Sequence, residues 1–369
     1  MRAASHRRTG FHPLPVAGLD RLTEDSLAIT FQVPEPLREA YASRPGQHVT
    51  VELPTTGEQV RRSYSVCSTP AQLAATGILR IGVKEIPGGV FSAYAASKLA
   101  VGDEVRVLPP LGHFTTDLRP DRSRWYVALA AGSGITPVLS LLTAALATEP
   151  ASRFTVFYGN RYARSVMFAD ELADAKDRWP DRLQVVHVLS REPGPSELLS
   201  GRIDAERLPR LLATFLPARV VTDPATEWFL CGPYQMVLDA RAVLADHGVS
   251  EQRVRTELFH VPDEQSGTPP AAAPAAGGGC ELTLVLDGRA SSVTTRPGER
   301  VLDAALRARA ELPYSCRGGV CATCRARVVE GEVRMARDWA LEPAERAAGY
   351  VLTCQSSPVS DRLTVDYDA

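Results

Sequence analysis

Four cysteines in the last quarter of the chain constrain its fold more than any other feature of the sequence. They have the spacing Cys316-x4-Cys321-x2-Cys324, followed by Cys354 after a gap of 29 residues. This is the ligand spacing of plant-type [2Fe–2S] clusters. Three thiolates on one short loop can reach both irons, and a fourth from a distant segment closes the cage. A structural zinc site, the alternative, usually has two short pairs of ligands. The spacing therefore predicts a [2Fe–2S] cluster.

The cysteine loop belongs to a separate C-terminal module. The run TPPAAAPAAGGG at residues 268–279 consists of small residues, Pro and Gly, so it has nothing to bury and is typical of a flexible linker. The module after it begins with a predicted β-hairpin that turns at Asp287-Gly288, continues with a helix and ends with the strand RLTVDY. Gly318 and Gly319 let the cysteine loop curl, so that backbone N–H groups can point at sulfur.

The first 260 residues divide into two parts near residue 120. Short strand-like runs broken by Gly and Pro fill the first part and favour an antiparallel barrel. In the second part, apolar strands such as WYVALAAG, FTVFYG, LQVVHVLS and WFLCG alternate with helices, which predicts a parallel doubly wound sheet. We therefore predict a multidomain fold: a β-barrel at 1–119, an α/β domain at 120–260, a linker at 261–279 and an α+β, β-grasp-like module at 280–369. The barrel runs are Leu27 to Val33, His48 to Leu53, Ile78 to Val83 and Glu104 to Leu108.

A glycine-rich turn follows the first strand of the α/β part. In AAGSGITP, Gly132 and Gly134 give a tight turn and let a pyrophosphate approach the backbone. Thr136 can cap the helix that follows, and Pro137 suits its first turn. The third glycine of the dinucleotide fingerprint is absent, so the turn alone is a weak signal for a nucleotide.

Two later segments strengthen the prediction of a nicotinamide nucleotide. Cys231-Gly232-Pro233 follows the strand WFL, at the carboxyl edge of the sheet where ligands bind, although a buried free cysteine is usually only a packing residue. Arg161 and Ser165 follow the second strand, where such a sheet meets the adenosine ribose. An acidic residue there would favour NADH, whereas arginine and serine suit the 2′-phosphate of NADPH. We predict NADPH, with NADH as the alternative.

Composition excludes several classes of function. With 41 basic and 43 acidic residues, the chain lacks the basic excess that attracts nucleic acid or an anionic membrane. No apolar run reaches the length of about 18 residues that a membrane span needs, and the basic start MRAASHRRTG is not followed by the apolar core of a secretory signal. An odd number of cysteines without such a signal favours a reducing compartment. We predict a cytoplasmic protein that binds neither nucleic acid nor membranes.

Two further motifs carry a resemblance to a known family. Arg62-Ser63-Tyr64-Ser65 matches the RxYS flavin motif of the ferredoxin–NADP reductase superfamily, and GGVFS, ending at Ser92, is similar to its downstream phosphate-binding turn. GSGITP and CGP match its nicotinamide motifs, in the family's order. The chain is therefore identified as a member of this superfamily, with a flavin barrel, a nucleotide domain and a C-terminal ferredoxin that together cover nearly its whole length.

The resemblance also implies roles for individual residues. Arg62 would bind the flavin phosphate, Tyr64 would stack on the isoalloxazine ring, and Ser65 would hydrogen-bond near its reactive nitrogen, which agrees with their chemistry. Ser92 would sit at a helix N-terminus under the pyrophosphate, and Phe259 would cover the flavin face. The resemblance further places Ser65 and Cys231 at the reacting centre and adds Ser63, Gly89 and Val90 to the flavin contacts.

Within the superfamily, the sequence most resembles the reductase subunits of ring 1,2-phenylacetyl-CoA epoxidases. The similar stretches are RPGQHVTVEL, YGNRYARSVMF, GRIDAERL, LDAALRARAELPYSCRGGVCATC and LEPAERAAGYVLTCQ. This implies FAD as the flavin and, as the partner, the oxygenase component of a multicomponent monooxygenase, the di-iron phenylacetyl-CoA epoxidase of phenylacetate degradation. Reductases of 3-ketosteroid 9α-hydroxylases and of aromatic-ring dioxygenases are the alternatives.

Three redox sites in one chain imply an order of electron transfer. NAD(P)H donates a hydride, which carries two electrons, whereas a [2Fe–2S] cluster accepts one, so a flavin must stand between them. We therefore predict an NAD(P)H-dependent oxidoreductase that passes electrons through flavin and cluster to an acceptor protein. We expect the acceptor to dock on the module near Cys316 to Cys324. A redox sensor, whose cluster regulates without conducting, is the alternative from another class.

Overall fold

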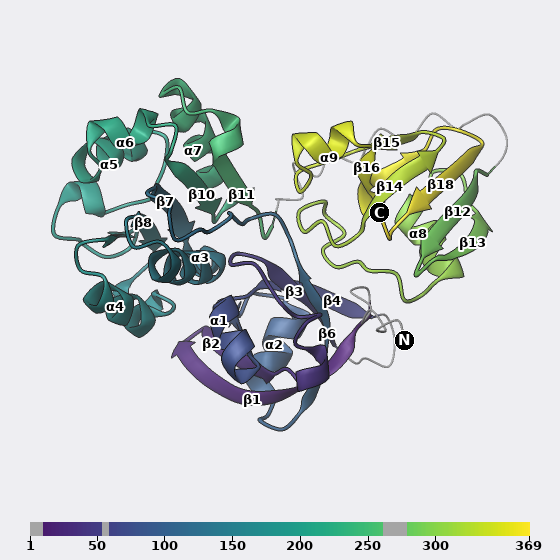
Figure 1. Ribbon diagram of the computed structural model, residues 1–369, viewed down its shortest axis with the longest axis horizontal. Coiled ribbons are helices and arrows are strands. Elements are labelled where there is room, and N and C mark those ends of the chain that lie inside the picture. Colours follow the sequence, from purple (N-terminus) through teal and green to yellow (C-terminus); the bar gives the residue numbers. More distant parts are fainter. Residues whose placement is uncertain (1–9, 54–58, 261–278) are drawn as a thin grey trace.

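The computed structural model describes residues 10–53, 59–260 and 279–369. Figure 1 shows three lobes that follow the sequence in order: a purple-to-blue lobe rich in strands, a teal-to-green lobe with a sheet between helices, and a smaller green-to-yellow lobe. The predicted multidomain fold is therefore confirmed. The predicted linker lies outside the described residues, except for Gly279.

The first lobe is an antiparallel β-barrel. Its strands pair in the order β4-β3-β6-β1-β2-β5, and a bridge between Val66 and Ile81 joins the two edges of the sheet. Alternate residues such as Leu14, Ile29 and Val51 point inward and are fully buried, as a half-exposed sheet requires. The strands are β1 (His12–Thr23), β2 (Ser26–Gln32), β3 (His48–Leu53), β4 (Val60–Ser65), β5 (Ile78–Lys84) and β6 (Glu104–Leu111), and the helices are α1 (Pro70–Thr76) and α2 (Val90–Ser97).

The second lobe is a parallel sheet with helices on both faces. Its strand order is β11-β10-β7-β8-β9, and one apolar cluster on each face buries the helices against it. The order reverses between β7 and β10, so the segments that follow these two strands lie at the switch point where such sheets bind ligands. The elements are β7 (Trp125–Ala131), α3 (Ile135–Thr148), β8 (Arg153–Asn160), α4 (Ala169–Arg178), β9 (Leu183–Leu189), α5 (Arg207–Phe215), α6 (Ala218–Thr222), β10 (Glu227–Cys231), α7 (Tyr234–Asp246) and β11 (Val254–Glu257).

One local prediction in this lobe is wrong. We expected Thr136 to cap the helix after the glycine-rich turn, but α3 begins two residues earlier than such a cap requires, at Ile135, and its N-cap is Gly134. Thr136 lies inside the first turn, where its hydroxyl donates a hydrogen bond of 2.9 Å to the carbonyl of Ser133. The helix starts early because a short 3-10 turn over Gly132–Gly134 leads directly into it.

The third lobe is a mixed sheet with one helix packed across it. The strand order is β13-β12-β18-β14-β16, with β12 and β18 parallel, and a second small sheet pairs β15 with β17. The predicted hairpin is confirmed, because Asp287 and Gly288 both have the left-handed φ of a tight two-residue turn. The elements are β12 (Glu281–Leu286), β13 (Arg289–Thr294), α8 (Val301–Ala308), β14 (Arg325–Glu330), β15 (Val333–Met335), α9 (Pro343–Ala347), β16 (Tyr350–Leu352), β17 (Ser356–Pro358) and β18 (Arg362–Asp366).

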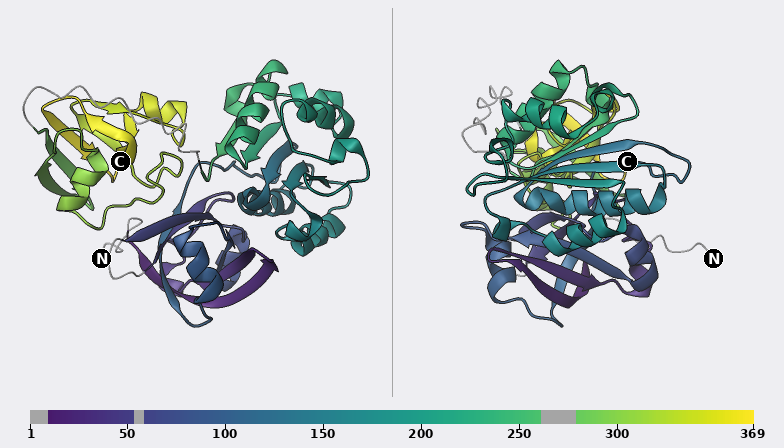
Figure 2. Two further views of the ribbon diagram at one scale, coloured as in Figure 1. Left: turned by 180° about the vertical axis from the view of Figure 1, so that it is seen from behind. Right: turned by 90° about the vertical axis from the view of Figure 1, so that its left-hand side faces the viewer.

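The third lobe contacts both of the others. The left view of Figure 2 shows it beside the barrel and the parallel-sheet lobe. Its Trp339 lies against Tyr234 of α7, with ring centroids 5.4 Å apart, and its Val320 packs on the apolar cluster of the second lobe. No helix in the described parts of the chain is long and apolar enough to cross a membrane.

Candidate functional site

The four predicted cluster cysteines come together in the third lobe as two pairs. The thiols of Cys316 and Cys321 interact with each other, and those of Cys324 and Cys354 do the same. Within 10–53, 59–260 and 279–369, no group of three or more His, Cys, Asp or Glu side chains could hold one metal ion. Two thiolates for each of two irons is the donor set of a [2Fe–2S] cluster, so the residues fit that group.

The backbone of the cysteine loop is held in unusual conformations around the sulfurs. Arg317 and Ala322 have left-handed φ values of 52° and 53°, which non-glycine residues rarely adopt away from functional sites. The N–H of Gly318 lies 3.4 Å from the Cys316 sulfur, and the amide of Gln355 lies 3.6 Å from the Cys354 sulfur. The prediction that backbone N–H groups point at sulfur is confirmed for Gly318, toward Cys316, and for Gly319, toward Cys354.

The two thiols of each pair shift each other's pKa in opposite directions. The interacting thiol of Cys321 lowers the pKa of Cys316 to about 7, and the thiol of Cys324 lowers the pKa of Cys354. The pKa values of Cys321 and Cys324 are raised, first by these same paired thiols and then by burial. One cysteine of each pair is therefore the easier to deprotonate, and a bound metal would complete the deprotonation.

The predicted flavin motif lies on β4 at the end of the barrel. Arg62 is exposed, and Tyr64 is half-buried with its ring centroid 5.3 Å from that of Phe91 on α2. A tyrosine face beside an exposed arginine suits an aromatic ring that carries a phosphate. Ser63 pairs with Thr50 of β3 through their hydroxyls, 3.2 Å apart, on the opposite side of the strand.

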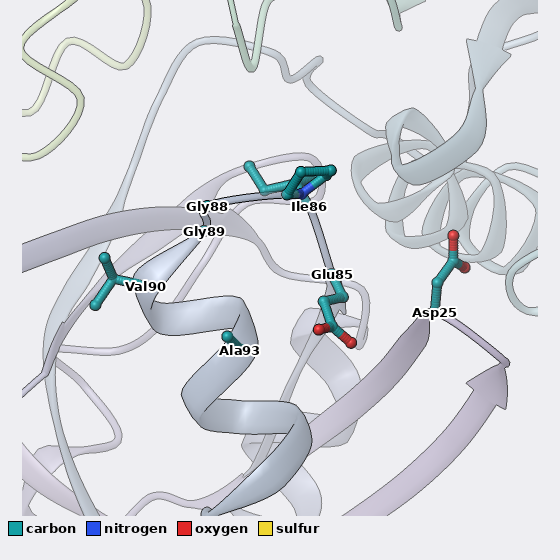
Figure 3. Close-up of a pocket in the computed structure, with 8 residues that line it drawn as sticks. Asp25, Glu85, Ile86, Gly88, Gly89, Val90 and Ala93 are labelled. Carbon is teal, nitrogen blue, oxygen red and sulfur yellow. The ribbon is translucent and has the colours of Figure 1, made fainter.

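The predicted phosphate turn borders a hollow of about 540 Å³. Gly88, Gly89 and Val90 line one side, and the carboxylates of Asp25 and Glu85 stand on the other (Figure 3). Ser92 is in the first turn of α2, as predicted, but its buried hydroxyl donates a 3.2 Å hydrogen bond to the carbonyl of Gly89. Ser92 therefore fixes the shape of the turn, and the N–H groups at the start of α2 are left for an anion.

The two predicted nicotinamide motifs lie against each other at the switch point. A Cβ placed on Gly134 would be 2.0 Å from the carbonyl oxygen of Cys231, and one on Gly232 would be 3.2 Å from the Cβ of Ala131. Cys231 is fully buried, and burial raises its pKa well above the ordinary value. Its thiol therefore stays protonated at neutral pH and can act as a packing or hydrogen-bonding group.

The segment predicted to discriminate between NADPH and NADH lies at the carboxyl end of β8. Arg161 and Arg164 are exposed there, and the Arg164 guanidinium lies 4.3 Å above the ring of Tyr162. The hydroxyl of Ser165 donates a 2.7 Å hydrogen bond to the carbonyl of Tyr162, which closes the loop. Two exposed guanidinium groups at this edge leave the predicted site accessible to an anionic ligand.

A buried polar chain joins the barrel to the second lobe and was not predicted from the sequence. The hydroxyl of Ser65, on β4, donates a 3.0 Å hydrogen bond to Glu257 at the end of β11. The other oxygen of Glu257 lies 3.5 Å from Nδ1 of buried His48, on β3. Burial lowers the pKa of His48, but Glu257 and the nearby Cys321 sulfur raise it more. Phe259, two residues after Glu257, is partly exposed at the same edge.

Three family models match successive parts of the chain. An oxidoreductase FAD-binding domain matches residues 13–116, an oxidoreductase NAD-binding domain matches residues 128–242, and a 2Fe-2S iron-sulfur cluster binding domain matches residues 284–359. The matches follow the order of the three lobes and contain the flavin, nicotinamide and cysteine motifs described above, apart from Phe259.

Full-length relatives have the same arrangement. The chain is 42% identical over 362 residues to a subunit of the 1,2-phenylacetyl-CoA epoxidase of Escherichia coli (strain K12), covering 98% of this chain and 99% of that protein. It is 34% identical to the ferredoxin reductase component of the 3-ketosteroid-9-alpha-monooxygenase of Rhodococcus rhodochrous, with 96% of each covered. An intact type IV self-sufficient cytochrome P450 monooxygenase superposes with a TM-score of 0.66 and 27% identity, over 96% of this chain and 41% of its own.

Proposed function

We propose that this chain, which belongs to the family of FAD-, NAD- and [2Fe–2S]-binding reductase subunits that serve oxygenases, supplies electrons from NADPH to the di-iron oxygenase of a phenylacetyl-CoA epoxidase. The observation that carries the choice of partner is the 42% identity to a phenylacetyl-CoA epoxidase component over almost the whole of both chains, against 34% to a ketosteroid monooxygenase component. The reductase chemistry does not depend on that choice, because both relatives are components of oxygenase systems.

The proposed site assigns each motif to one cofactor. Arg62 and Tyr64 would contact FAD together with the turn at Gly89 and Val90, and Phe259 would cover the ring, whereas the side chain of Ser63 points to the other face of β4, toward Thr50. Gly132, Gly134, Thr136, Pro137, Gly232 and Pro233 would form the nicotinamide cleft. The four paired cysteines would hold the cluster. The flavin accepts two electrons as a hydride and gives them up singly, which matches a two-electron donor to a one-electron acceptor.

Ser65 and Glu257 are the groups placed to handle a proton at the flavin. The Ser65 hydroxyl donates its single hydrogen to Glu257, so its oxygen would accept a hydrogen bond from a flavin N–H, with the carboxylate as its other partner. Cys231 would contact the nicotinamide as a neutral thiol, since burial keeps it protonated. The seven free cysteines suit a reducing compartment, and we propose a cytoplasmic location. We also propose domain limits of 1–119, 120–260 and 280–369 around the linker.

Arg161 is expected to favour NADPH over NADH. Removing a guanidinium that pairs with the 2′-phosphate should lower kcat/KM for NADPH by about tenfold and leave the value for NADH nearly unchanged. The change to make is Arg161→Ala, with steady-state kinetics on both nucleotides. Arg153→Ala is the matched control, because Arg153 lies at the opposite end of β8. A wild-type kcat/KM for NADH that equals or exceeds that for NADPH would contradict the assignment.

The choice of partner is tested by reconstitution. The purified chain, NADPH, the epoxidase oxygenase subunits and phenylacetyl-CoA should together yield epoxide, and omission of the chain should abolish it. The parallel mixture contains a steroid 9α-hydroxylase oxygenase with a ketosteroid, the function of the second relative. Product in that mixture alone would show that the partner is the steroid hydroxylase. A third assay measures the reduction of cytochrome c by NADPH. A reductase of either oxygenase should sustain this reaction over many turnovers, whereas a redox sensor would not.

A further inference from the structure

Arg61, the neighbour of the flavin-motif arginine, is buried between the barrel and the third lobe. Its side chain is 2% exposed, although arginine is almost never fully buried unless its donors are paired. Nε donates to Glu52 at 2.7 Å, one terminal nitrogen donates to Gln59 at 2.9 Å, and the other donates to the carbonyl of Leu312 at 2.8 Å. Leu312 belongs to the third lobe, so this single side chain joins two lobes.

Aromatic rings from both sides complete the environment of the guanidinium. Its carbon lies 4.4 Å from the ring centroid of Tyr314, in the third lobe, and 4.5 Å from that of Phe11, at the start of the barrel. Such cation–π contacts are stronger when the cation is desolvated. The guanidinium carbon of Arg317 also lies 5.0 Å from the ring centroid of Tyr314, and Arg317 directly follows the predicted cluster ligand Cys316. The contact with Arg61 is therefore made by the segment that leads into the cysteine loop.

The register of β3 and β4 places Arg61 in a row of polar pairs that faces the cysteine loop. Opposite residues on these strands are Glu52 and Arg61, then Thr50 and Ser63, then His48 and Ser65. The first two pairs have a counterpart in the third lobe. Arg61 contacts Leu312 and Tyr314, and the hydroxyl of Thr50 lies 3.5 Å from that of Thr323.

This arrangement differs from the expectation that the loop from Cys316 to Cys324 is an open docking face for the acceptor. Cys321 and Thr323 are buried, and Val320 packs against the second lobe. A further contact at 3.1 Å joins His113, after β6, to Glu345 of α9. In this structure the loop side of the cluster is turned toward the flavin-binding lobe.

We propose that the polar face of β3 and β4 is the internal docking surface for the cluster-bearing lobe, and that Arg61 is the positioning residue that fixes its register. β4 would then serve two cofactors with adjacent arginines: Arg62 on the flavin and Arg61 on the lobe that carries the cluster. The consequence for electron transfer rests on the function proposed above, whereas the docking itself does not.

The structure gives a reason why Arg61 anchors this surface and its neighbours do not. A buried guanidinium that loses one acceptor is left with an unpaired donor, so the lobe cannot shift without a cost. Arg106 ion-pairs with the same carboxylate of Glu52 and lies 5.6 Å from the ring of Phe11, but it is half exposed, and among the described residues it forms no hydrogen bond or ion pair with the third lobe. Arg106 is therefore a matched control: the same charge, the same carboxylate partner and no such link to the docked lobe.

Hydrogen–deuterium exchange on the full-length holoprotein tests the docking. Arg61→Met should speed amide exchange in residues 312–323 and in β3–β4 by roughly tenfold, because the interface opens more often. Arg106→Met should leave these segments unchanged. Tyr314→Leu removes the ring from the other side of the contact and should reproduce the effect in β3–β4, which keeps the test decisive if Arg61→Met does not fold. Equal exchange in all variants, or equal increases for Arg61→Met and Arg106→Met, would overturn the proposal.

Stopped-flow absorbance with NADPH tests what the docking does. In Arg61→Met, flavin reduction should stay within about twofold of wild type, while cluster reduction should slow by roughly tenfold or more, because misplacement by about 1 Å can cost that much. Arg61→Lys keeps the positive charge but lacks the forked guanidinium group. Its rate of cluster reduction should therefore lie between those of wild type and Arg61→Met. Unchanged cluster reduction, or an equal loss of flavin reduction, would overturn the positioning role. If wild type itself fails to reduce its cluster, the proposed function fails, and the exchange data still decide the docking.

Discussion

Replacing Cys321 with serine should lower electron delivery to the oxygenase by roughly a hundredfold or more, while leaving reduction of the flavin by NADPH within about twofold of wild type. Cys321 is the paired partner of Cys316, so its loss leaves one iron with a single thiolate. A serine hydroxyl is a harder and less acidic ligand than a thiol, and the site is buried, which makes a replacement by water costly. The flavin site lies upstream and does not use this residue.

The comparison is made with Cys280→Ser in the same lobe. Cys280 is also buried, but it packs in the apolar core beside β12 and away from the cluster cysteines. The measurements are iron per chain, visible absorption, ferricyanide reduction, and transfer to the oxygenase. We expect Cys280→Ser to keep its iron and its transfer, and Cys321→Ser to keep only ferricyanide reduction. Loss of flavin reduction in Cys321→Ser would mean that the sites are not arranged in series, and zinc in place of iron in wild type would refute the cluster.

The sequence was most informative where function depends on closely spaced residues. Cys316, Cys321 and Cys324 are set by local spacing, and the third lobe brings in Cys354 as predicted. The division of the four into two pairs could not be predicted, because it depends on how the loop closes over Gln355 and Gly319. Spacing along the chain specifies which ligands are available, and only the folded loop specifies which of them share a metal.

Residues that act across lobes were missed for a related reason. Ser65, Glu257 and His48 come from three separate strands, and nothing in their local sequence marks them as neighbours. Arg61 stands beside the motif residue Arg62, but β-strand alternation sends the two side chains to opposite faces. In an arginine-rich chain, one arginine on a strand is an ordinary surface charge. Only its burial against another lobe distinguishes it.

The limits of local prediction are also clear in single elements. β1 was not predicted, because Pro13, Pro15 and Gly18 interrupt its alternation, yet it pairs with both β2 and β6. Helix α4 begins only at Ala169, although the residues before it are apolar, since Phe168 has a left-handed φ of 57°. In both places tertiary packing overrides the local signal: Leu14, Val16 and Phe168 are buried in the cores that hold these segments.

Gly134→Ala should disrupt the nicotinamide site more than any other single methyl group added to it. Gly134 has an ordinary φ of −61°, so conformational strain is not the reason for glycine. The reason is space, because a Cβ would lie 2.0 Å from the carbonyl oxygen of Cys231, on a neighbouring strand that cannot move away freely. Forcing the two strand ends apart should cost about 3 kcal/mol and lower Tm by about 6–12 °C. NADPH affinity should fall by at least about tenfold, since both motifs are displaced.

Gly132→Ala is the comparison that decides why this turn needs glycine. The two explanations are a lack of space for a Cβ and a left-handed backbone conformation. Gly132 has a left-handed φ of 54°, but nothing lies within 4 Å of its Cβ position. Its substitution should therefore cost only the backbone strain, about 1–2 kcal/mol. Thermal unfolding of both variants, with NADPH titration of each and flavin absorbance as a check on the barrel, gives the comparison. A larger loss in Gly132→Ala than in Gly134→Ala would show that backbone conformation, and not the close approach of the two motifs, requires glycine in this turn.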